Sequence, residues 1–288
     1  MLSRDEIIYG YRFILGRDPE SEEVICFQQR NHASVADFRN SMLTSDEFME
    51  QAVEKTGYKV DSLSIRFHGR SDASITCILL ESAFNKALAL ESRLPPGILA
   101  MPGMSGRNYR RFINNLTGSV PNPRYLEIGS WMGSTACAAM YANQATITCV
   151  DNWSEFGGSP TVFLENIAKY RNEQIRFTFI EGDFRTVDFR DIGKHNIYFF
   201  DGPHSYQDQF DGAIIALEAL DMEYVFIVDD WNWPDPRAGS LSALSSRGLE
   251  VLYAIEIRTS QDDTHPSIKM QYSDWHNGYY LAAVRRSG

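Results

Sequence analysis

Basic residues are scarce in this 288-residue chain: Lys and Arg together number 27 against 38 Asp and Glu, giving a formal net charge of −11. Such a charge repels phosphate backbones and anionic lipid surfaces, which argues against nucleic acid and membrane as partners. With 43% hydrophobic and 23% charged residues, the composition is that of a folded globular protein. The length excludes a single small module.

Paired cysteine motifs and long apolar runs are also missing. Cys26, Cys77, Cys137 and Cys149 show no CxxC spacing, and three of them lie in apolar segments, so we expect reduced, structural thiols. The first ten residues are too acidic for a signal peptide, and no apolar run approaches the roughly 18 residues of a membrane span. Together these absences predict a cytoplasmic location.

Residues 1–57 predict a small N-terminal α-helical domain. Apolar residues recur at three- and four-residue steps over residues 7–15, which is typical of a helix with one buried face. Further helices are expected to begin at Ser21, Ser34 and Thr44, because N-capping residues there precede apolar segments.

Two segments of this domain, YRFILGRDPE (residues 11–20) and DFRNSMLTSDEF (residues 37–48), resemble a short bacterial helical domain with an LGR-x-P signature. The function of that domain is unknown, and it occurs beside glycan-processing enzymes and in surface proteins. The resemblance therefore suggests a context rather than a chemistry. The helices could serve a homo-oligomer or a protein partner, or form a helical cap without one.

Residues 58–123 predict a helical connector, with helices near residues 73–92 and 106–116. The breaker-rich segment LPPGILAMPGMSG (residues 94–106) lies between them. Because it comes shortly before the first expected strand, its part Met101–Arg107 could close over a ligand as a lid. A plain linker is the alternative.

From residue 124 onward, short β-branched and aromatic runs alternate with helical segments. This pattern predicts an α/β fold over residues 124–288: a doubly wound, seven-stranded, mostly parallel sheet with helices on both faces. The expected strands are 124–128, 146–150, 176–180, 196–200, 224–228, 249–257 and 279–284. The expected helices are 134–142, 161–172, 206–220 and 241–247. The last two strands are joined by a long loop without a helix, so the last strand is expected to run antiparallel.

Ligands of such sheets bind beyond the carboxyl ends of the strands. The first strand ends in EIGSWMGST, where Gly129 and Gly133 flank a turn into a helix opened by Ser134, and glycine lets a ligand approach the backbone. Asp151 ends the second strand 22 residues after Gly129 and could accept both hydroxyls of a ribose. A dinucleotide is disfavoured because its fingerprint needs glycine where this chain has Trp131.

The motifs EIGSWMGST, CVDNW, EGD, FFDGPH and IVDDW follow one another at five expected strand ends. In this they resemble the class I S-adenosylmethionine-dependent methyltransferases, over roughly residues 104–288. The resemblance implies that Gly129 and Gly133 line the amino acid part of the cofactor, Asp151 binds its ribose and Asp183 its adenine. The full set of implied cofactor contacts is Glu127, Gly129, Ser130, Gly133, Ser134, Asp151, Asn152, Gly182, Asp183 and Asp201.

Asp201, Asp229 and Asp230 follow two strands that are expected to be neighbours. Three close carboxylates repel one another unless a cation joins them, and oxygen ligands suit Mg²⁺, so we predict a magnesium site. Alternatively, Asp201 contacts the cofactor and one of the other two caps the next segment. His204 stands three residues after Asp201 and is the candidate general base; these two are the predicted catalytic pair.

The segment DGPH followed by DDW resembles the metal-dependent sugar O-methyltransferases of macrolide biosynthesis. In that family the D-x-x-H histidine is the general base, and the acidic trio holds Mg²⁺ against two neighbouring sugar hydroxyls. Related catechol-type enzymes carry lysine at the matching position. The resemblance implies methylation of a hydroxyl on a sugar or glycosylated small molecule. A phenolic small-molecule substrate and a non-catalytic binding module are the alternatives.

Three further segments are weaker candidates. Trp231 and Trp233 could stack on a sugar or pack in the core. Residues 275–277 could reach the cleft or form an ordinary edge turn. Residues 262–265 contain two aspartates and His265, which could bind a second metal, but a solvated loop is the better interpretation.

Overall fold

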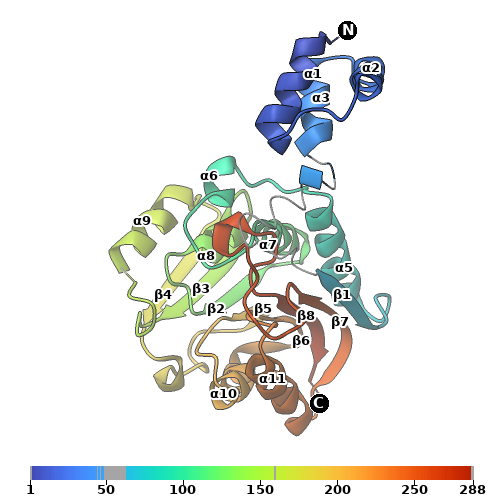
Figure 1. The fold of residues 1–288 in the computed structure, drawn as a ribbon. Helices are drawn as coiled ribbons and strands as arrows, with labels where there is room; N and C mark the ends of the chain where they lie inside the picture. The colour runs from blue at the N-terminus through green and yellow to red at the C-terminus, as the bar shows by residue number, and fades with distance from the viewer. Residues whose placement is uncertain (1, 44, 46, 49–62, 159, 287–288) are drawn as a thin grey trace. The chain divides into compact units, whose positions relative to one another are not determined.

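The computed structural model describes residues 2–43, 45, 47–48, 63–158 and 160–286, and the chain forms two compact units, Met1–Val60 and Asp61–Gly288 (Figure 1). All four cysteines are unpaired; Cys26 is exposed and the other three are buried. Within the ranges just given, no helix combines the length and the apolar character needed to cross a bilayer.

The first unit is a small helical cluster. It contains α1 (Arg4–Gly10), the π-helix η1 (Tyr11–Leu15), α2 (Glu22–Asn31) and α3 (Val35–Leu43). Ser21 caps α2 and Ser34 accepts the N–H of Asp37 at the start of α3, which confirms two of the expected helix starts. Its core consists of Leu2, Ile7, Tyr11, Leu15, Ile25, Phe38 and Met42. The expected cap at Thr44 lies outside the described residues.

The second unit is built on one eight-stranded sheet. Its strands are β1 (Ser64–Gly69), β2 (Arg124–Ile128), β3 (Ala145–Asp151), β4 (Ile175–Glu181), β5 (His195–Phe200), β6 (Leu220–Val228), β7 (Glu250–Arg258) and β8 (Tyr279–Arg285). Across the sheet the order is β1-β7-β8-β6-β5-β2-β3-β4. Strands β2 to β6 pair in parallel, whereas β8 runs antiparallel to β6 and β7, as expected for the last strand.

Strand β1 corrects the expected number of strands from seven to eight. It forms one edge of the sheet, antiparallel to β7, with Ser64 opposite Arg258. Most of β1 is exposed, and its sequence SIRFHG lacks the apolar run of a buried strand, so the pattern gave no strand signal. The segment expected to form a helical connector, residues 58–123, thus contributes β1 to the sheet unit.

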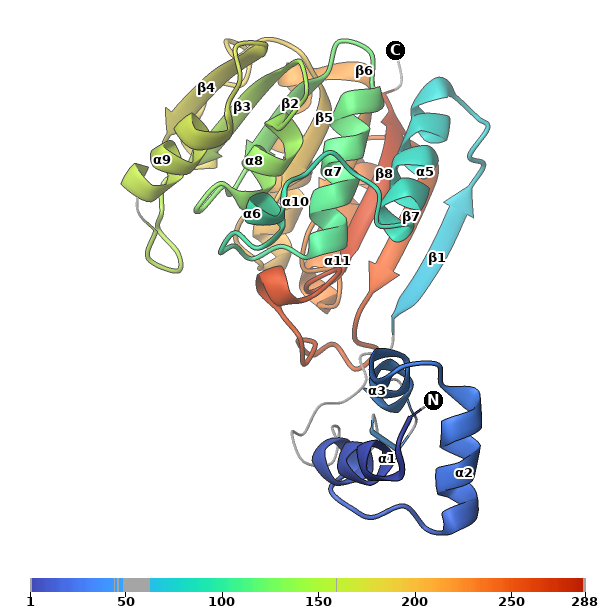
Figure 2. The same cartoon turned by 90° about the horizontal axis from the view of Figure 1, so that it is seen from above.

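Helices cover both faces of the sheet (Figure 2). One face carries α5 (Ile75–Leu88), α6 (Pro96–Leu99), α7 (Arg107–Ser119), α8 (Ser134–Met140) and α9 (Pro160–Tyr170). The other carries α10 (Tyr206–Ile215) and α11 (Pro234–Ser246), and three short 3₁₀ turns are η2 (Phe184–Thr186), η3 (Leu217–Ala219) and η4 (Met270–Tyr272). Helix α11 begins seven residues earlier than the expected 241, because proline fits the first turn of a helix. The expected helix 206–220 was too long, because α10 ends at Ile215 and β6 begins at Leu220.

Alternate residues of the central strands build two cores. In β5, Ile197 and Phe199 join the core under α5, α7 and α8, whereas Tyr198 and Phe200 join the core under α10 and α11. Because both faces are buried, these strands read as continuous apolar runs, and this made them recognisable in the sequence.

The strand order reverses between β2 and β5, and such a reversal opens a crevice beyond the strand ends. Gly129 follows β2 there with φ +89°, and a Cβ on it would lie 1.8 Å from the carbonyl oxygen of Asp201, which follows β5. Only glycine allows the two strand ends to lie this close.

Replacing Gly129 with alanine should therefore destabilise the protein more than the same replacement at Gly193. Gly193 has a similar φ of +80° but open space around it, so Gly193→Ala should carry only left-handed backbone strain, about 1–2 kcal/mol. Gly129→Ala adds a clash with backbone. Urea unfolding of both variants measures the difference, and equal losses would contradict this packing constraint.

Candidate active site

A cavity of about 430 Å³ opens beyond the carboxyl ends of the parallel strands, a size common for small-molecule sites. Eight of the ten expected cofactor contacts line it: Gly129, Ser130, Ser134, Asp151, Asn152, Gly182, Asp183 and Asp201. His204, Asp229 and Asp230 line the same cavity. The fold thus brings the motifs of five strand ends to one place.

The other two expected contacts, Glu127 and Gly133, lie outside the cavity wall. Glu127 is fully buried on β2, where it accepts a hydrogen bond from the Tyr125 hydroxyl, and burial raises its pKa to about 7. Gly133 precedes α8 with φ +81°, and a Cβ on it would lie 2.9 Å from the ring of Phe163 on α9. Gly133 therefore allows α8 and α9 to pack closely.

Asp151, at the end of β3, anchors the loop after β2. Its two oxygens accept the backbone N–H groups of Trp131 and Trp153, each at 2.7 Å. These bonds stabilise the left-handed backbone of both tryptophans, at φ +42° and +50°. Each carboxylate oxygen keeps acceptor capacity for a ligand hydroxyl. Asp183, after β4, accepts the N–H of Arg185 at 2.9 Å and so begins the turn η2.

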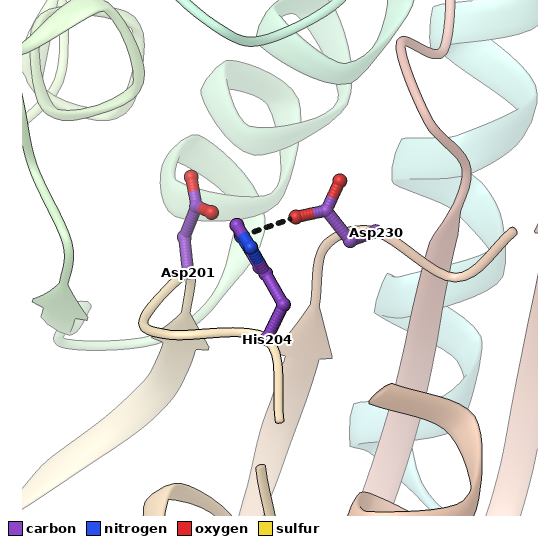
Figure 3. A group of neighbouring side chains, drawn as sticks. All are labelled: Asp201, His204 and Asp230. Atoms are coloured by element: carbon purple, nitrogen blue, oxygen red, sulfur yellow. Dashed lines mark ion pairs between the residues drawn. The ribbon is translucent and has the colours of Figure 1, made fainter. Parts of the chain in front are cut away.

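Asp201, His204 and Asp230 form a compact group at the ends of β5 and β6 (Figure 3). One potential ligand atom from each lies within 4.8 Å of the others. His204 Nε2 is 2.8 Å from Asp230 Oδ2, and the Asn277 amide donates to Asp230 Oδ1 at 2.7 Å. Both oxygens of Asp230 are therefore held in place.

Asp229 lies outside this group, although the sequence suggested a trio of Asp201, Asp229 and Asp230 as metal ligands. Asp229 Oδ1 accepts the N–H of Asp230 at 2.7 Å. Asp230 has left-handed backbone with φ +56°, so the two successive side chains do not alternate as they would in a continuing strand. The group therefore contains His204 in place of the expected Asp229.

The charges in this group depend strongly on one another. Burial raises the pKa of Asp201, and repulsion from Asp230 raises it further. Burial would lower the pKa of His204, but its hydrogen bond with Asp230 and the charges of both aspartates raise it to about 9. For Asp230, bonds from His204 and Asn277 outweigh burial and lower the pKa. Two carboxylates thus share one imidazole, and the group fits an additional cation.

Of the tryptophan candidates, one lines the cavity and two are buried in the protein core. Trp233 lines the cavity, with its ring centroid 5.1 Å from that of His204. Trp231 is 1% exposed and stacks on Tyr280, so it belongs to the core. Trp275 is equally buried and packs against Phe84.

The loop between β7 and β8 supplies a further wall of the cavity, formed by His265, Lys269, Met270 and His276. His276 Nδ1 accepts the N–H of Met270 at 2.9 Å. Lys269 and Met270 had no expected role, because an aperiodic loop gives no sign of which side chains face inward. Asp263 pairs with Arg237 and Arg258. Within the described ranges, Asp201, His204 and Asp230 are the one group that could hold a metal ion.

The expected lid, Met101–Arg107, is packed into the sheet unit. Met104 lines the cavity, the carbonyl of Met101 accepts a bond from buried Arg110 at 2.7 Å, and the N–H of Arg107 donates to the carbonyl of Ser273 at 2.8 Å. The segment forms part of the cavity wall in this structure.

Comparison with known proteins supports one enzyme class. Residues 126–231 match the family model of a methyltransferase domain. This part of the chain is similar to a methyltransferase domain. This match spans the ends of β2 to β6, and so includes Asp201, His204 and Asp230.

Solved structures are similar at low sequence identity. The SAH-bound methyltransferase from Podospora anserina is 17% identical with a TM-score of 0.42, over 85% of this chain and 98% of that chain. TrmN from Thermus thermophilus is 14% identical with a TM-score of 0.44, over 100% of this chain and 80% of that chain. No curated protein matches this chain.

Replacing Glu127 with glutamine should change how stability depends on pH. Because burial raises the pKa of Glu127 from 4.5 to about 7, the unfolded chain ionises this group first as the pH rises. Ionisation of this group therefore lowers the stability of the wild type by at most about 3 kcal/mol between about pH 4.5 and 7, and Glu127→Gln lacks this contribution. Urea unfolding of both proteins at pH 5 and pH 7.5 tests this. A stability difference that stays constant with pH would contradict it.

Proposed function

We propose that the protein is an S-adenosylmethionine-dependent O-methyltransferase that uses a divalent cation, with Mg²⁺ as the expected ion. The acceptor is a hydroxyl of a sugar or a glycosylated small molecule. The observation that carries this proposal is the group of Asp201, His204 and Asp230 at the floor of the cavity. In this group, two carboxylates and a potential proton acceptor line the cavity in which the proposed cofactor and the acceptor hydroxyl would meet.

The cavity fits S-adenosylmethionine through its polar wall. Asp151 and Asp183 follow neighbouring strands and offer carboxylate oxygens to ribose and adenine, while Ser130 and Ser134 offer hydroxyls near the turn at Gly129. When bound, S-adenosylmethionine would supply an electrophilic methyl group on a sulfonium. The residues of this chain would orient it and exclude water.

A divalent cation fits the floor of the cavity because of the charges there. Asp201 and Asp230 repel one another, and the single imidazole of His204 offsets only one of them. Carboxylate oxygens are the ligands that Mg²⁺ prefers. When bound by Asp201 and Asp230, the cation would compensate their charge and polarise an acceptor hydroxyl.

His204 is the proposed general base. Its Nε2 faces Asp230, and the two aspartates keep it protonated at pH 7, with its pKa raised to about 9. Once the charge of Asp201 and Asp230 is compensated, His204 loses this stabilisation and could accept the acceptor's proton at Nε2. In the structure Asp230, held by Asn277, positions the ring through this same Nε2. Binding of the cation by Asp230 would free this atom.

Two features favour a sugar acceptor: the proposed base His204 and the aromatic side chain in the cavity wall. An alcohol releases its proton less readily than a phenol, so it needs a positioned base as well as polarisation, and His204 supplies that base. Trp233, beside His204, offers an aromatic surface to the C–H face of a sugar. We propose a small-molecule or glycan acceptor rather than nucleic acid, because the net charge is −11.

Asp230→Asn should weaken Mn²⁺ binding by at least about 10-fold, since it removes one of two charged ligands. The matched variant Asp229→Asn should bind Mn²⁺ nearly as the wild type does, because the Asp229 carboxylate is turned to the N–H of Asp230. Calorimetric titration of each protein with Mn²⁺ measures this. Stronger loss in Asp229→Asn than in Asp230→Asn would show that the trio expected from the sequence binds the ion.

His204→Ala should lower methyl transfer to a sugar by about 10² to 10⁴ at saturating Mg²⁺, the usual contribution of a positioned base. The control is His265→Ala, which removes another cavity histidine that contacts Trp233 rather than Asp230. The measurement uses labelled S-adenosylmethionine with a panel of sugars and phenols. If a phenol is labelled, and if this labelling persists both in His204→Ala and after Mg²⁺ is chelated, the assigned base, cation and substrate class are wrong.

A further inference from the structure

His276, in the loop between β7 and β8, lines the cavity and carries a hydrogen-bond donor without a partner. Its side chain is buried, with the residue 6% exposed. A backbone N–H can only donate, so the bond from Met270 makes His276 Nδ1 an acceptor and leaves the ring proton on Nε2. Among the described residues, none accepts this proton. A ligand atom that accepts it would satisfy a buried polar group.

Lys269 adds a charged donor beside His276. Its side chain lines the same cavity, and its charge contributes to the lowered pKa of His276, whose main cause is burial. Carboxylates outnumber basic residues in this chain by 38 to 27, and yet Lys269 has no ion pair with any residue that the structure describes.

Both groups can donate hydrogen bonds and neither can accept one. They therefore match a ligand group that only accepts, as a carboxylate or a phosphate does. A hydroxyl could accept from either group, but it would leave the charge of Lys269 uncompensated.

These donors lie on the acceptor side of the cavity. In the sheet, β2, β3 and β4, whose ends supply the residues proposed for the cofactor, lie on one side of β5, and β6, β8 and β7 lie on the other. Asn277, which follows His276, donates to Asp230. Lys269 and His276 are therefore close to the proposed cation and base rather than to the ends of β3 and β4.

We propose that Lys269 and His276 bind an anionic group of the acceptor, so that the substrate is an acidic sugar. His276 Nε2 donates to one oxygen of this group, and Lys269 compensates its charge. A hexuronate carboxylate and a sugar phosphate share the chemistry that these donors recognise. This inference rests on the proposed function, because it takes a sugar hydroxyl as the methylated group.

The test uses sugars that differ only at carbon 6: glucose, glucuronate and glucose 6-phosphate, with the matching galactose and mannose sets. Methyl transfer from labelled S-adenosylmethionine with Mg²⁺ should show a kcat/KM at least about 10-fold higher for an anionic sugar than for its neutral counterpart, the scale of one charge-assisted hydrogen bond. The anionic sugar with the higher value identifies the group as a carboxylate or a phosphate.

Lys269→Met should lower this preference by about 10-fold, and Lys269→Arg should keep most of it because the charge remains. His276→Asn retains an oxygen to accept the N–H of Met270 but loses the Nε2 donor, so it should also lower the preference by about 10-fold. The matched control is Lys86→Met, which removes another exposed charge, on α5 and outside the cavity wall. It should leave the preference unchanged.

Calorimetry with S-adenosylhomocysteine separates this role from one in donor binding, since Lys269→Met and His276→Asn should bind it as the wild type does. Weaker binding in these variants would assign the two residues to the donor and overturn the proposal. Equal kcat/KM for neutral and anionic sugars in the wild type, or equal losses for both in the variants, would overturn it as well. A wild type that methylates none of these sugars would instead overturn the proposed function itself.

Discussion

The register of β5 and β6 determines which side chains meet at the candidate active site. Phe200 and Val228 are paired in the parallel ladder, so the first residues after the two strands lie side by side. Both strands are buried on both faces, and the polar residues after them are the first that reach the cavity. Asp201 and Asp230 therefore come together in a partly buried place, with His204 close to both. Burial and repulsion from Asp230 raise the pKa of Asp201, whereas the attraction between His204 and Asp230 raises the pKa of His204 and lowers that of Asp230.

Elements far apart in the sequence support this group. The antiparallel strand β8 lies beside β6, and the residue pair before it, His276 and Asn277, reaches the cavity wall and Asp230. On the other side, Gly129 permits β2 to approach Asp201. Under the proposed function, Asp201 would lie between the cofactor and the acceptor hydroxyl.

The second unit has a buried positive charge at one place and an excess of negative charge at another. Arg110 is a buried cation held by carbonyls and a serine, and it connects through Ser105 to Ser134 on the cavity wall. In the cavity wall, Asp201 and Asp230 form a partly buried anionic pair. The proposed divalent cation would compensate the charge of this pair.

Seven of the eight strands, the antiparallel last strand and the polar residues at the strand ends could be predicted from the amino-acid sequence, because runs of β-branched and aromatic residues bounded by turn residues are a local signature of strands. It also placed Asp201, His204 and Asp230 among the candidates. Only the tertiary structure revealed the exposed edge strand β1, which has no such signature, and separated Asp229 from Asp230 through a left-handed backbone. The partners of Arg110 and the inward turn of His276 depend on contacts between distant segments, and local periodicity carries no information about those.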